Sequence, residues 1–280
     1  MSDAAIHHST SSFTASDGVN IFHQSWMPDG PPRSTVLLVH GLGEHSGRYG
    51  HVAEALVRAG HTVHALDHRG HGRSGGRRTF VRSYDEFLRD LDQFRHLVGR
   101  DGVPTVLLGH SMGGNIATGY ALGNGADVDA LVLSGPALHV GDEFTPTRLA
   151  VFRAIAKVAP AFRPQGLPAD AISRDPAVVA AYLADPLVFS GKITAGLGAA
   201  LIGAMQSFPS RYHELRMPIL LLHGTEDRLA DIAGSRSLEA AAGGTEVTAH
   251  YYEGLYHEVF NEPEQDRVIG DLVAWLDARV

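Results

Sequence analysis

Two serines of the chain lie in the pattern Gly-x-Ser-x-Gly, which positions a serine hydroxyl for nucleophilic attack when it occupies a tight turn between a strand and a helix. Ser111 stands in "GHSMGG" and Ser74 stands in "GRSGG". The apolar run "TVLLG" precedes Ser111 and an apolar helical pattern follows it, whereas Ser74 lies in the polar loop "DHRGHGRSGGRR". We therefore predict that Ser111 is a catalytic nucleophile and that Ser74 is a loop residue.

A serine hydroxyl becomes a good nucleophile when a histidine accepts its proton and a carboxylate orients that histidine. In one hydrolase arrangement the order along the chain is serine, acid, histidine, with the last two on loops after late strands. Asp227 and Glu226 follow the apolar run "PILLLHG", and His257 follows the next strand pattern. We predict Asp227 as the acid, with Glu226 as the second choice, because Asp231 lies further out where it can begin a turn. His257 is the predicted base.

Acyl transfer also requires hydrogen-bond donors for the oxyanion. The backbone N–H of Met112, directly after the nucleophile, is one candidate, and that of Leu42 in the glycine-rich loop "HGLGEHSGRYG" is the other. A nucleotide-binding loop is disfavoured, because Ser46 stands where a dinucleotide fingerprint needs glycine and Asn115 stands where a phosphate loop needs lysine. We predict that Leu42 and Met112 form an oxyanion hole.

Composition excludes several classes of protein. The 280 residues carry a formal net charge of −8 without a basic stripe, so nucleic acid is not an expected partner. There is no cysteine, which excludes disulfides and thiolate chemistry. His68 and His71 stand among arginines, whose charge opposes a bound cation, so we expect no metal site and no cofactor.

The hydropathy of the chain indicates in which compartment of the cell the protein is expected. The first residues lack a basic start and an apolar stretch, so no signal peptide is visible, and no segment has the ~18 apolar residues of a spanning helix. We expect a cytoplasmic enzyme by default, with peripheral membrane or cell-envelope contact left open. His7 and His8 are expected in a disordered terminus.

The elements that must position these residues follow an alternating order. Short β-branched runs at residues 34–41, 62–67 and 105–109 alternate with amphipathic stretches, which predicts a mostly parallel sheet covered by helices on both faces. The expected helix at residues 84–99 has Phe87, Leu91, Phe94 and Leu97 or Val98 on its apolar face. His250 lies inside a late predicted strand, where a structural role is expected.

One segment interrupts this order. Residues 137–212 contain apolar helical patterns and no convincing strand. We predict a helical cap over the carboxyl edge of the sheet, with residues 1–136 and 213–280 forming the α/β core.

Taken together, "HGLGEHSGRY", "DHRGHGRSGG", "GHSMGG", "SRDP", "LLLHGTEDRL" and "YEGLYHE" resemble monoacylglycerol lipases of the α/β-hydrolase fold, in particular the mycobacterial type. The resemblance runs from about residue 13 to the last helix. It implies Ser111, Asp227 and His257 as the triad, and Glu44, Arg48 and Tyr182 as contacts of the glycerol end.

The function expected from this resemblance is hydrolysis of monoacylglycerols to fatty acid and glycerol through an acyl-enzyme. Apolar cap residues are expected to line an acyl channel and to contact micelles or membranes transiently; they are Phe144, Leu149, Phe152, Ile155, Leu197, Leu201 and Ile202. A homodimer is left open. The alternatives are a carboxylesterase, lysophospholipase or acyltransferase that uses the same triad, and a non-catalytic binder with the same fold.

Overall fold

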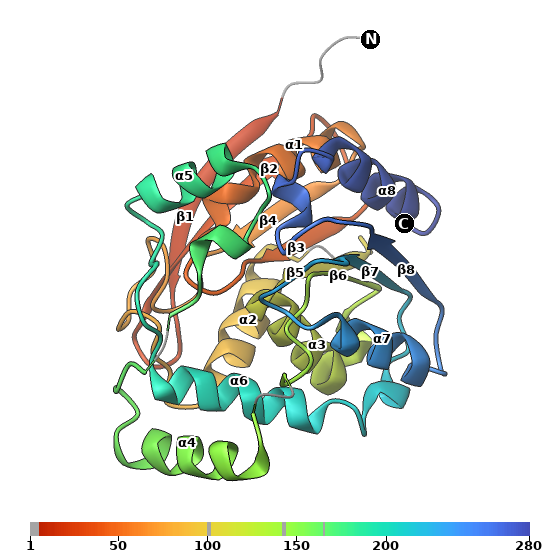
Figure 1. Ribbon diagram of the computed structural model, residues 1–280. Coiled ribbons are helices and arrows are strands. Elements are labelled where there is room, and N and C mark those ends of the chain that lie inside the picture. The colour runs from red at the N-terminus through yellow and green to blue at the C-terminus, as the bar shows by residue number, and fades with distance from the viewer. Residues whose placement is uncertain (1–5, 100–101, 142–143, 165) are drawn as a thin grey trace.

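The structure, a computed structural model, describes residues 6–99, 102–141, 144–164 and 166–280. Its centre is an eight-stranded sheet with the order β1-β2-β4-β3-β5-β6-β7-β8 (Figure 1). The strands are β1 His7–Thr14, β2 Asn20–Met27, β3 Thr35–Val39, β4 Thr62–Leu66, β5 Thr105–His110, β6 Ala130–Ser134, β7 Ile219–Gly224 and β8 Val247–Tyr252. Strands β3 to β8 pair in parallel, whereas β1 and β2 join antiparallel at one end. The predicted α/β fold with a mostly parallel sheet is confirmed.

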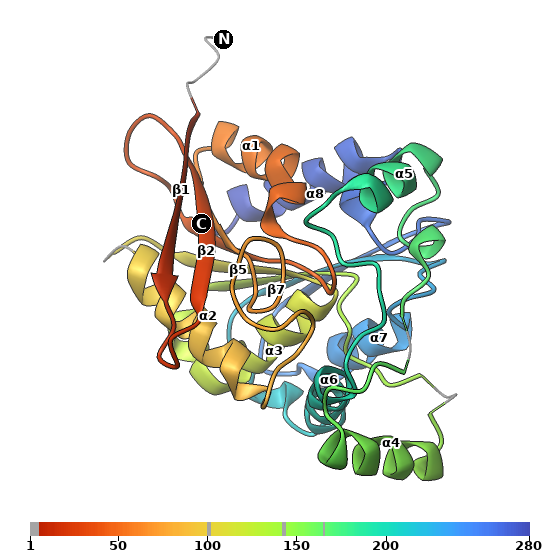
Figure 2. The ribbon, with the colours of Figure 1, turned by 90° about the vertical axis from the view of Figure 1, so that its left-hand side faces the viewer.

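Helices cover both faces of this sheet (Figure 2). They are α1 Gly50–Arg58, α2 Asp85–Val98, α3 Met112–Asn124, α4 Pro146–Val158, α5 Pro176–Ala184, α6 Ala195–Ser207, α7 Ile232–Ala241 and α8 Gln265–Asp277. Because side chains alternate along a strand, Leu37 and Leu107 join the apolar cluster under α2 and α3, while Leu38 and Leu108 join the cluster under α1 and α8. The two clusters fix the strands, and therefore the loops at their carboxyl ends.

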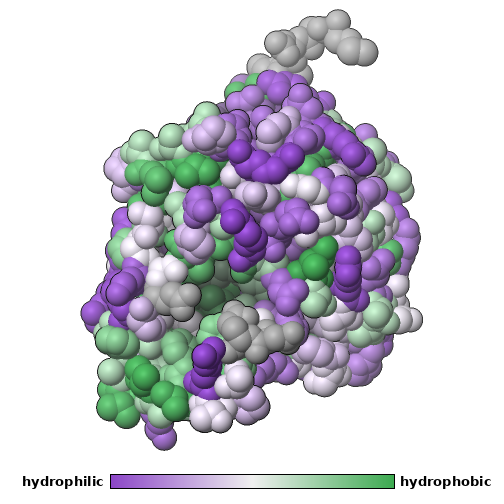
Figure 3. All heavy atoms as spheres, viewed as in Figure 1, coloured by the Kyte–Doolittle hydropathy of each residue, from purple (hydrophilic) through white to green (hydrophobic). Residues whose placement is uncertain are grey.

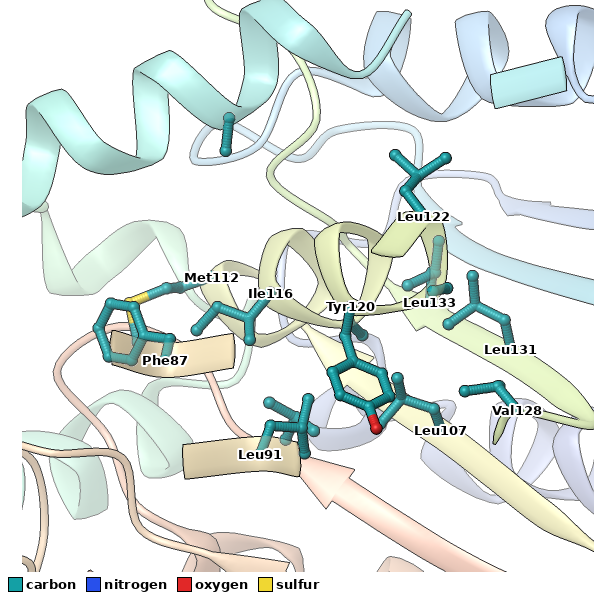
Figure 4. Close-up of a cluster of buried hydrophobic side chains, with 14 of the residues drawn as sticks. Phe87, Leu91, Leu107, Met112, Ile116, Tyr120, Leu122, Val128, Leu131 and Leu133 are labelled. Atoms are coloured by element: carbon teal, nitrogen blue, oxygen red, sulfur yellow. The ribbon is translucent and has the colours of Figure 1, made fainter. Parts of the chain in front are cut away.

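Helix α3 is the centre of the first cluster. Met112, Ile116 and Tyr120 point from it toward Phe87 and Leu91 of α2 (Figure 4). Nearly every residue of α3 is buried from Met112 to Leu122, because the helix lies between the sheet and α2. The helix that begins directly after Ser111 is therefore held on all sides.

The segment between β6 and β7 contains α4, α5 and α6 and, among its described residues, no strand. Its helices begin at side-chain caps: Thr145, Asp175 and Thr194 each accept a hydrogen bond from a backbone N–H of the first turn. Figures 1 and 2 place α4 and α6 together and α5 apart from them, at the end of the molecule that also holds α1 and α8. We refer to this segment as the cap; its boundaries at 137 and 212 stay a prediction.

The expectation of a disordered terminus at His7 and His8 is wrong. His7 and His8 lie in β1, an edge strand paired with β2, where His7 bonds to Asp29 (2.7 Å) and His8 to Gln24 (3.0 Å). Of the two alternatives for the last apolar position of α2, Val98 packs against the first cluster, whereas Leu97 is 54% exposed. No helix in the described part of the chain is long and apolar enough to span a membrane.

Candidate active site

Ser111 occupies a strained turn between β5 and α3. Its backbone has φ 53° and ψ −117°, a conformation that costs a non-glycine residue free energy and persists where the surroundings enforce it. The enforcement comes from small neighbours: a Cβ at Gly113 would lie 2.0 Å from the carbonyl oxygen of Val39, and one at Gly109 would lie 2.5 Å from that of Gly113. Helix and strand approach so closely that only glycine fits, and the serine is raised at the edge of the sheet.

The acid and the histidine come from the loops after β7 and β8. The side chain of Asp227 is fully buried, and its Oδ2 lies 2.7 Å from Nδ1 of His257. Its Oδ1 accepts hydrogen bonds from the backbone N–H groups of Leu229 (2.8 Å) and Ala230 (2.9 Å). His223 adds a contact of 3.1 Å from Nε2 to Oδ2. The carboxylate is therefore held from two sides with one oxygen directed at His257.

These contacts set the charge states of the pair. Burial alone would raise the pKa of Asp227, but His257 and the hydrogen bonds outweigh it and hold that pKa well below its usual range. Burial alone would lower the pKa of His257, and Asp227 raises it above the ordinary value of 6.5. The neighbouring His110, whose ring lies 4.7 Å from that of His257, has its pKa lowered to about 3, chiefly by burial. His257 is thus the imidazole that can take up a proton next to Ser111.

A small cavity joins these residues. It has a volume of about 30 Å³, and both Ser111 and His257 line it. The other lining residues are Gly41, Leu42, Glu44, His110, Leu167, Pro168, Ala169, Ile172, Tyr182, Leu229 and Glu258. Of the predicted oxyanion donors, Leu42 lies on this cavity, and Met112 is the first residue of α3, where an N–H has no partner inside the helix.

The predicted glycerol contacts form a buried ionic network. Glu44 accepts hydrogen bonds from the backbone N–H of Gly41 (2.6 Å), from the hydroxyl of Tyr49 (2.6 Å) and from Arg48 (2.7 Å). Burial opposes its ionisation, but Arg48 and the nearby histidines lower the pKa of Glu44 to about 2. Glu44 is therefore a charged group that braces the loop after β3.

Sequence reasoning missed Glu258. Its carboxylate receives two hydrogen bonds from Arg48, at 2.6 Å and 2.7 Å, and the guanidinium also lies 4.8 Å from the ring centre of Tyr182. Arg48 is thus shared between Glu44, Glu258 and the cap. The only available sequence signal was the position of Glu258 directly after His257.

The remaining candidates lie elsewhere. Ser74 binds the backbone at Phe22 (2.8 Å) and Asp67 (2.6 Å), as a loop residue does. Asp231 caps α7 and bonds to His139 (2.9 Å). Glu226 has no hydrogen bond to His257 in the described part of the chain. His250 lies in β8, as predicted.

His68 and His71, in the polar loop that contains Ser74, are buried and pack against His40. The ring of His40 lies 4.6 Å from that of His68 and 5.5 Å from that of His71. Burial lowers the pKa of both loop histidines, that of His71 to about 3. They therefore stay neutral and act as packed aromatic groups.

The expected acyl-channel residues are dispersed. None of them lines the catalytic cavity: Leu197 and Leu201 pack in the core cluster under α3, and Ile155 is 37% exposed. Apolar contacts at the cavity come instead from Leu42, Leu167, Ile172 and Leu229.

Comparison with known proteins shows which family the chain belongs to. The profile of the Hydrolase_4 family, described as serine aminopeptidase, S33, matches residues 30–264. The monoacylglycerol lipase of Mycolicibacterium smegmatis is 48% identical over 270 residues, 95% of each chain. The chain belongs to the monoacylglycerol lipase family of hydrolases.

More distant monoacylglycerol lipases extend the likeness. The human monoglyceride lipase is 33% identical over 94% of this chain and 88% of its own length. The crystal structure of the Paleococcus ferrophilus monoacylglycerol lipase superimposes with a TM-score of 0.83 at 30% identity, covering 99% of this chain and all of the other. The family and the α/β-hydrolase fold predicted from the sequence are confirmed.

Proposed function

We propose that this enzyme hydrolyses monoacylglycerols to a free fatty acid and glycerol, with Ser111 as nucleophile, His257 as general base and Asp227 as the group that orients His257. The observation that carries the proposal is the convergence of a strained Ser111 and an Asp227-bound His257 on one cavity. The high identity to monoacylglycerol lipases over the whole chain supports the choice of substrate.

The reaction proceeds in two halves. His257 takes the proton of Ser111 as its hydroxyl attacks the ester carbonyl, and the N–H groups of Leu42 and Met112 stabilise the oxyanion. His257 then gives the proton to the departing glycerol oxygen, leaving an acyl-serine. In the second half, water attacks the acyl-serine with His257 again as base, which releases the fatty acid and restores Ser111.

The carboxylates of the cavity suit a leaving group rich in hydroxyls. Glu44 and Glu258 both line it, and Arg48 donates hydrogen bonds to both side chains, whose oxygens can also accept from hydroxyl groups. Tyr182 contributes from the cap. We propose that Glu44, Glu258 and Tyr182 accept or donate hydrogen bonds to glycerol, while Arg48, which binds both carboxylates, orients them.

The cap must move for a substrate to enter. A cavity of about 30 Å³ holds roughly one water molecule, and its walls on the cap side are Leu167, Pro168, Ala169, Ile172 and Tyr182. Val151 and Val158 of α4 are 56% and 86% exposed, and Figure 3 shows an apolar area over that helix. We propose that the cap contacts a micelle or membrane transiently while it opens.

A direct test of the nucleophile uses a fluorophosphonate probe and monoacylglycerol turnover. The wild type should be labelled, and Ser111→Ala should lose labelling and roughly a thousandfold or more in kcat/KM. Ser74→Ala, in the other Gly-x-Ser-x-Gly segment, is the matched control and should keep the label. Full turnover by Ser111→Ala would refute the mechanism.

The substrate class is tested by rates on mono-, di- and triacylglycerols and lysophospholipids, measured above and below the aggregation threshold of each lipid. Monoacylglycerols should have the highest kcat/KM. Equal or faster cleavage of lysophospholipids would favour the carboxylesterase or lysophospholipase alternative.

A further inference from the structure

One stretch of the cap differs in charge from the chain as a whole. The protein has a formal net charge of −8, yet residues 144–169 contain four basic residues and no acidic one. They are Arg148, Arg153, Lys157 and Arg163, and the nearest acids along the chain are Asp142, Glu143 and Asp170. A basic stretch on an acidic protein marks a surface whose partner carries negative charge.

Two of these residues line a wide groove beside α4. The groove has a volume of about 500 Å³ and runs between α4, α6 and the loop before α2. Its basic residues are Arg82, Arg153 and Lys157. The others are Phe80, Val81, Ser83, Tyr84, Ala156, Pro160, Gly196, Ala199 and Ala200. Positive side chains thus stand at the rim of a mostly apolar groove.

The positive charges of the groove are not neutralised by the part of the protein that the structure describes. The guanidinium of Arg153 bonds to the side-chain amide of Gln206, which is uncharged. Arg82 and Lys157 have no ion pair with any described acidic residue. All three side chains belong to exposed residues. They are therefore available to an external anion.

An apolar stripe lies on the same helix. Val151, Ile155 and Val158 are spaced by four and three residues, so they share one face of α4, and all three are exposed. Phe162, just after the helix, is 53% exposed. Figure 3 shows this apolar area at the lower left of the molecule. A basic groove and an apolar stripe on one helix are the combination that lies in the headgroup region of an anionic bilayer.

We propose that this groove is a binding site for the phosphate headgroups of anionic phospholipids, with the stripe of α4 inserted among the acyl chains beneath them. The proposal deepens the proposed function, because it rests on the cap contacting a lipid surface and names the chemistry of that surface. Arg82, Arg153 and Lys157 bind the phosphates, and Val151, Ile155 and Val158 contact the hydrocarbon. The lipid surface then holds α4, which leads into the cap residues 167–169 that line the catalytic cavity.

The test measures cosedimentation of the full chain with phosphatidylcholine vesicles and with vesicles that also contain phosphatidylglycerol. The wild type should bind the anionic vesicles more tightly, and binding should weaken as salt is added. Each basic residue near such a surface contributes roughly fivefold in partitioning. The triple variant Arg82→Gln, Arg153→Gln, Lys157→Gln should therefore lose on the order of a hundredfold of its preference for anionic vesicles.

The matched control removes the same charge elsewhere. Arg58→Gln, Arg236→Gln, Arg267→Gln changes three exposed residues of α1, α7 and α8 and should keep most of the preference. Equal losses in both triple variants would show an effect of net charge alone and overturn the site. Salt-independent binding of the wild type would overturn it as well, without any variant.

Turnover of a water-soluble, dispersed ester separates this inference from the proposed function. Both triple variants should keep wild-type kcat/KM on that substrate, because none of the six residues lies on the catalytic cavity. A wild type that binds anionic vesicles but does not cleave monoacylglycerols would refute the proposed function and leave the lipid site standing. A wild type that cleaves them and binds both vesicles equally would refute the lipid site alone.

Discussion

The catalytic edge of the core and the cap are built in opposite ways. At the core edge, polar groups are buried and held by several hydrogen bonds each: the side chain of Asp227 is fully buried, and Glu44 is 3% exposed. In the cap, α6 packs into the core cluster, but the other two helices expose apolar groups: α5 has no buried residue, and α4 buries only Leu149. The polar site is held by many hydrogen bonds, whereas α4 and α5 have few buried apolar contacts to hold them in place.

This difference matches what each region has to do. Catalysis requires reacting groups held close to one geometry, which buried hydrogen bonds supply. Admission of a lipid requires an element that moves at low cost, and segments with few buried apolar contacts open most easily. Burial of polar groups thus serves precision, and exposure of apolar groups serves movement and lipid contact.

A methyl group added to one glycine of each region should show the largest contrast. At Gly113 a Cβ would overlap the carbonyl oxygens of Val39 (2.0 Å) and His40 (2.5 Å). Because backbone atoms cannot yield, Gly113→Ala should lower the free energy of unfolding by more than about 3 kcal/mol. Gly203 of α6 has no atom within 4 Å of such a Cβ. Gly203→Ala should raise the free energy of unfolding by up to about 1 kcal/mol.

Urea unfolding followed by circular dichroism measures both variants. If Gly113→Ala were as stable as the wild type, the close approach of α3 to β3 would be wrong. If Gly203→Ala were destabilised, the face of α6 at Gly203 would have to pack against another group, contrary to the open space beside it in the structure.

The second largest effect is expected on catalysis alone. Asp227→Asn preserves the shape of the side chain but removes the charge that orients and stabilises protonated His257, so kcat should fall roughly 10,000-fold. The melting temperature should change far less than the rate. Glu226→Gln, one residue away, is the control and should lose less than tenfold. A large loss of kcat in Glu226→Gln together with a small loss in Asp227→Asn would show that Glu226, and not Asp227, orients His257.

Much of the core and little of the network could be predicted from the sequence. Ser111, Asp227 and His257 follow apolar runs that form strands, and the carboxyl ends of parallel strands share one edge, so local patterns suffice to bring them together. Glu258 could not be predicted, because its partner Arg48 lies 210 residues away. An ion pair of this kind depends on how the loop after β3 and the loop after β8 meet, which no local pattern encodes.

Solvent exposure explains the other differences between the sequence predictions and the structure. Strand β1 is polar and exposed along nearly its whole length, so it lacks the alternation by which a strand is predicted. The cap residues expected in an acyl channel share hydropathy with core residues. Hydropathy alone does not tell Leu201, which packs in the core, from Val158, which faces solvent.

Removal of Arg48 should show how much more a buried ion pair contributes to stability than an exposed one. Arg48→Met keeps the length of the side chain but leaves Glu44 and Glu258 buried without a counter-charge. Breaking such a pair costs about 3–5 kcal/mol in the free energy of unfolding. Arg58→Met, which breaks an exposed pair with Glu54, should cost less than about 1 kcal/mol. Denaturant unfolding of the two variants measures the difference, and similar costs would show that the network is solvated.

The smallest predicted effect is a displacement of the pH dependence of kcat/KM. His257 must be neutral to accept the proton of Ser111, so activity falls as the pH drops through its pKa. Burial lowers that pKa, but Asp227, Glu258 and Glu44 raise it, and the net direction is above 6.5. The midpoint of the acid limb should therefore lie above pH 6.5.

Glu258→Gln tests the contribution of the network to this midpoint. The amide still accepts a hydrogen bond from Arg48, but the negative charge is gone and the positive charge of Arg48 is less compensated. Both changes disfavour protonated His257, so the acid limb should move to lower pH by up to about one unit, equivalent to 1.36 kcal/mol. His110, which also faces His257, stays neutral in this range because its pKa is about 3. A limb that stays in place would mean that Glu258 supports the loop mechanically and has no electrostatic effect on the base.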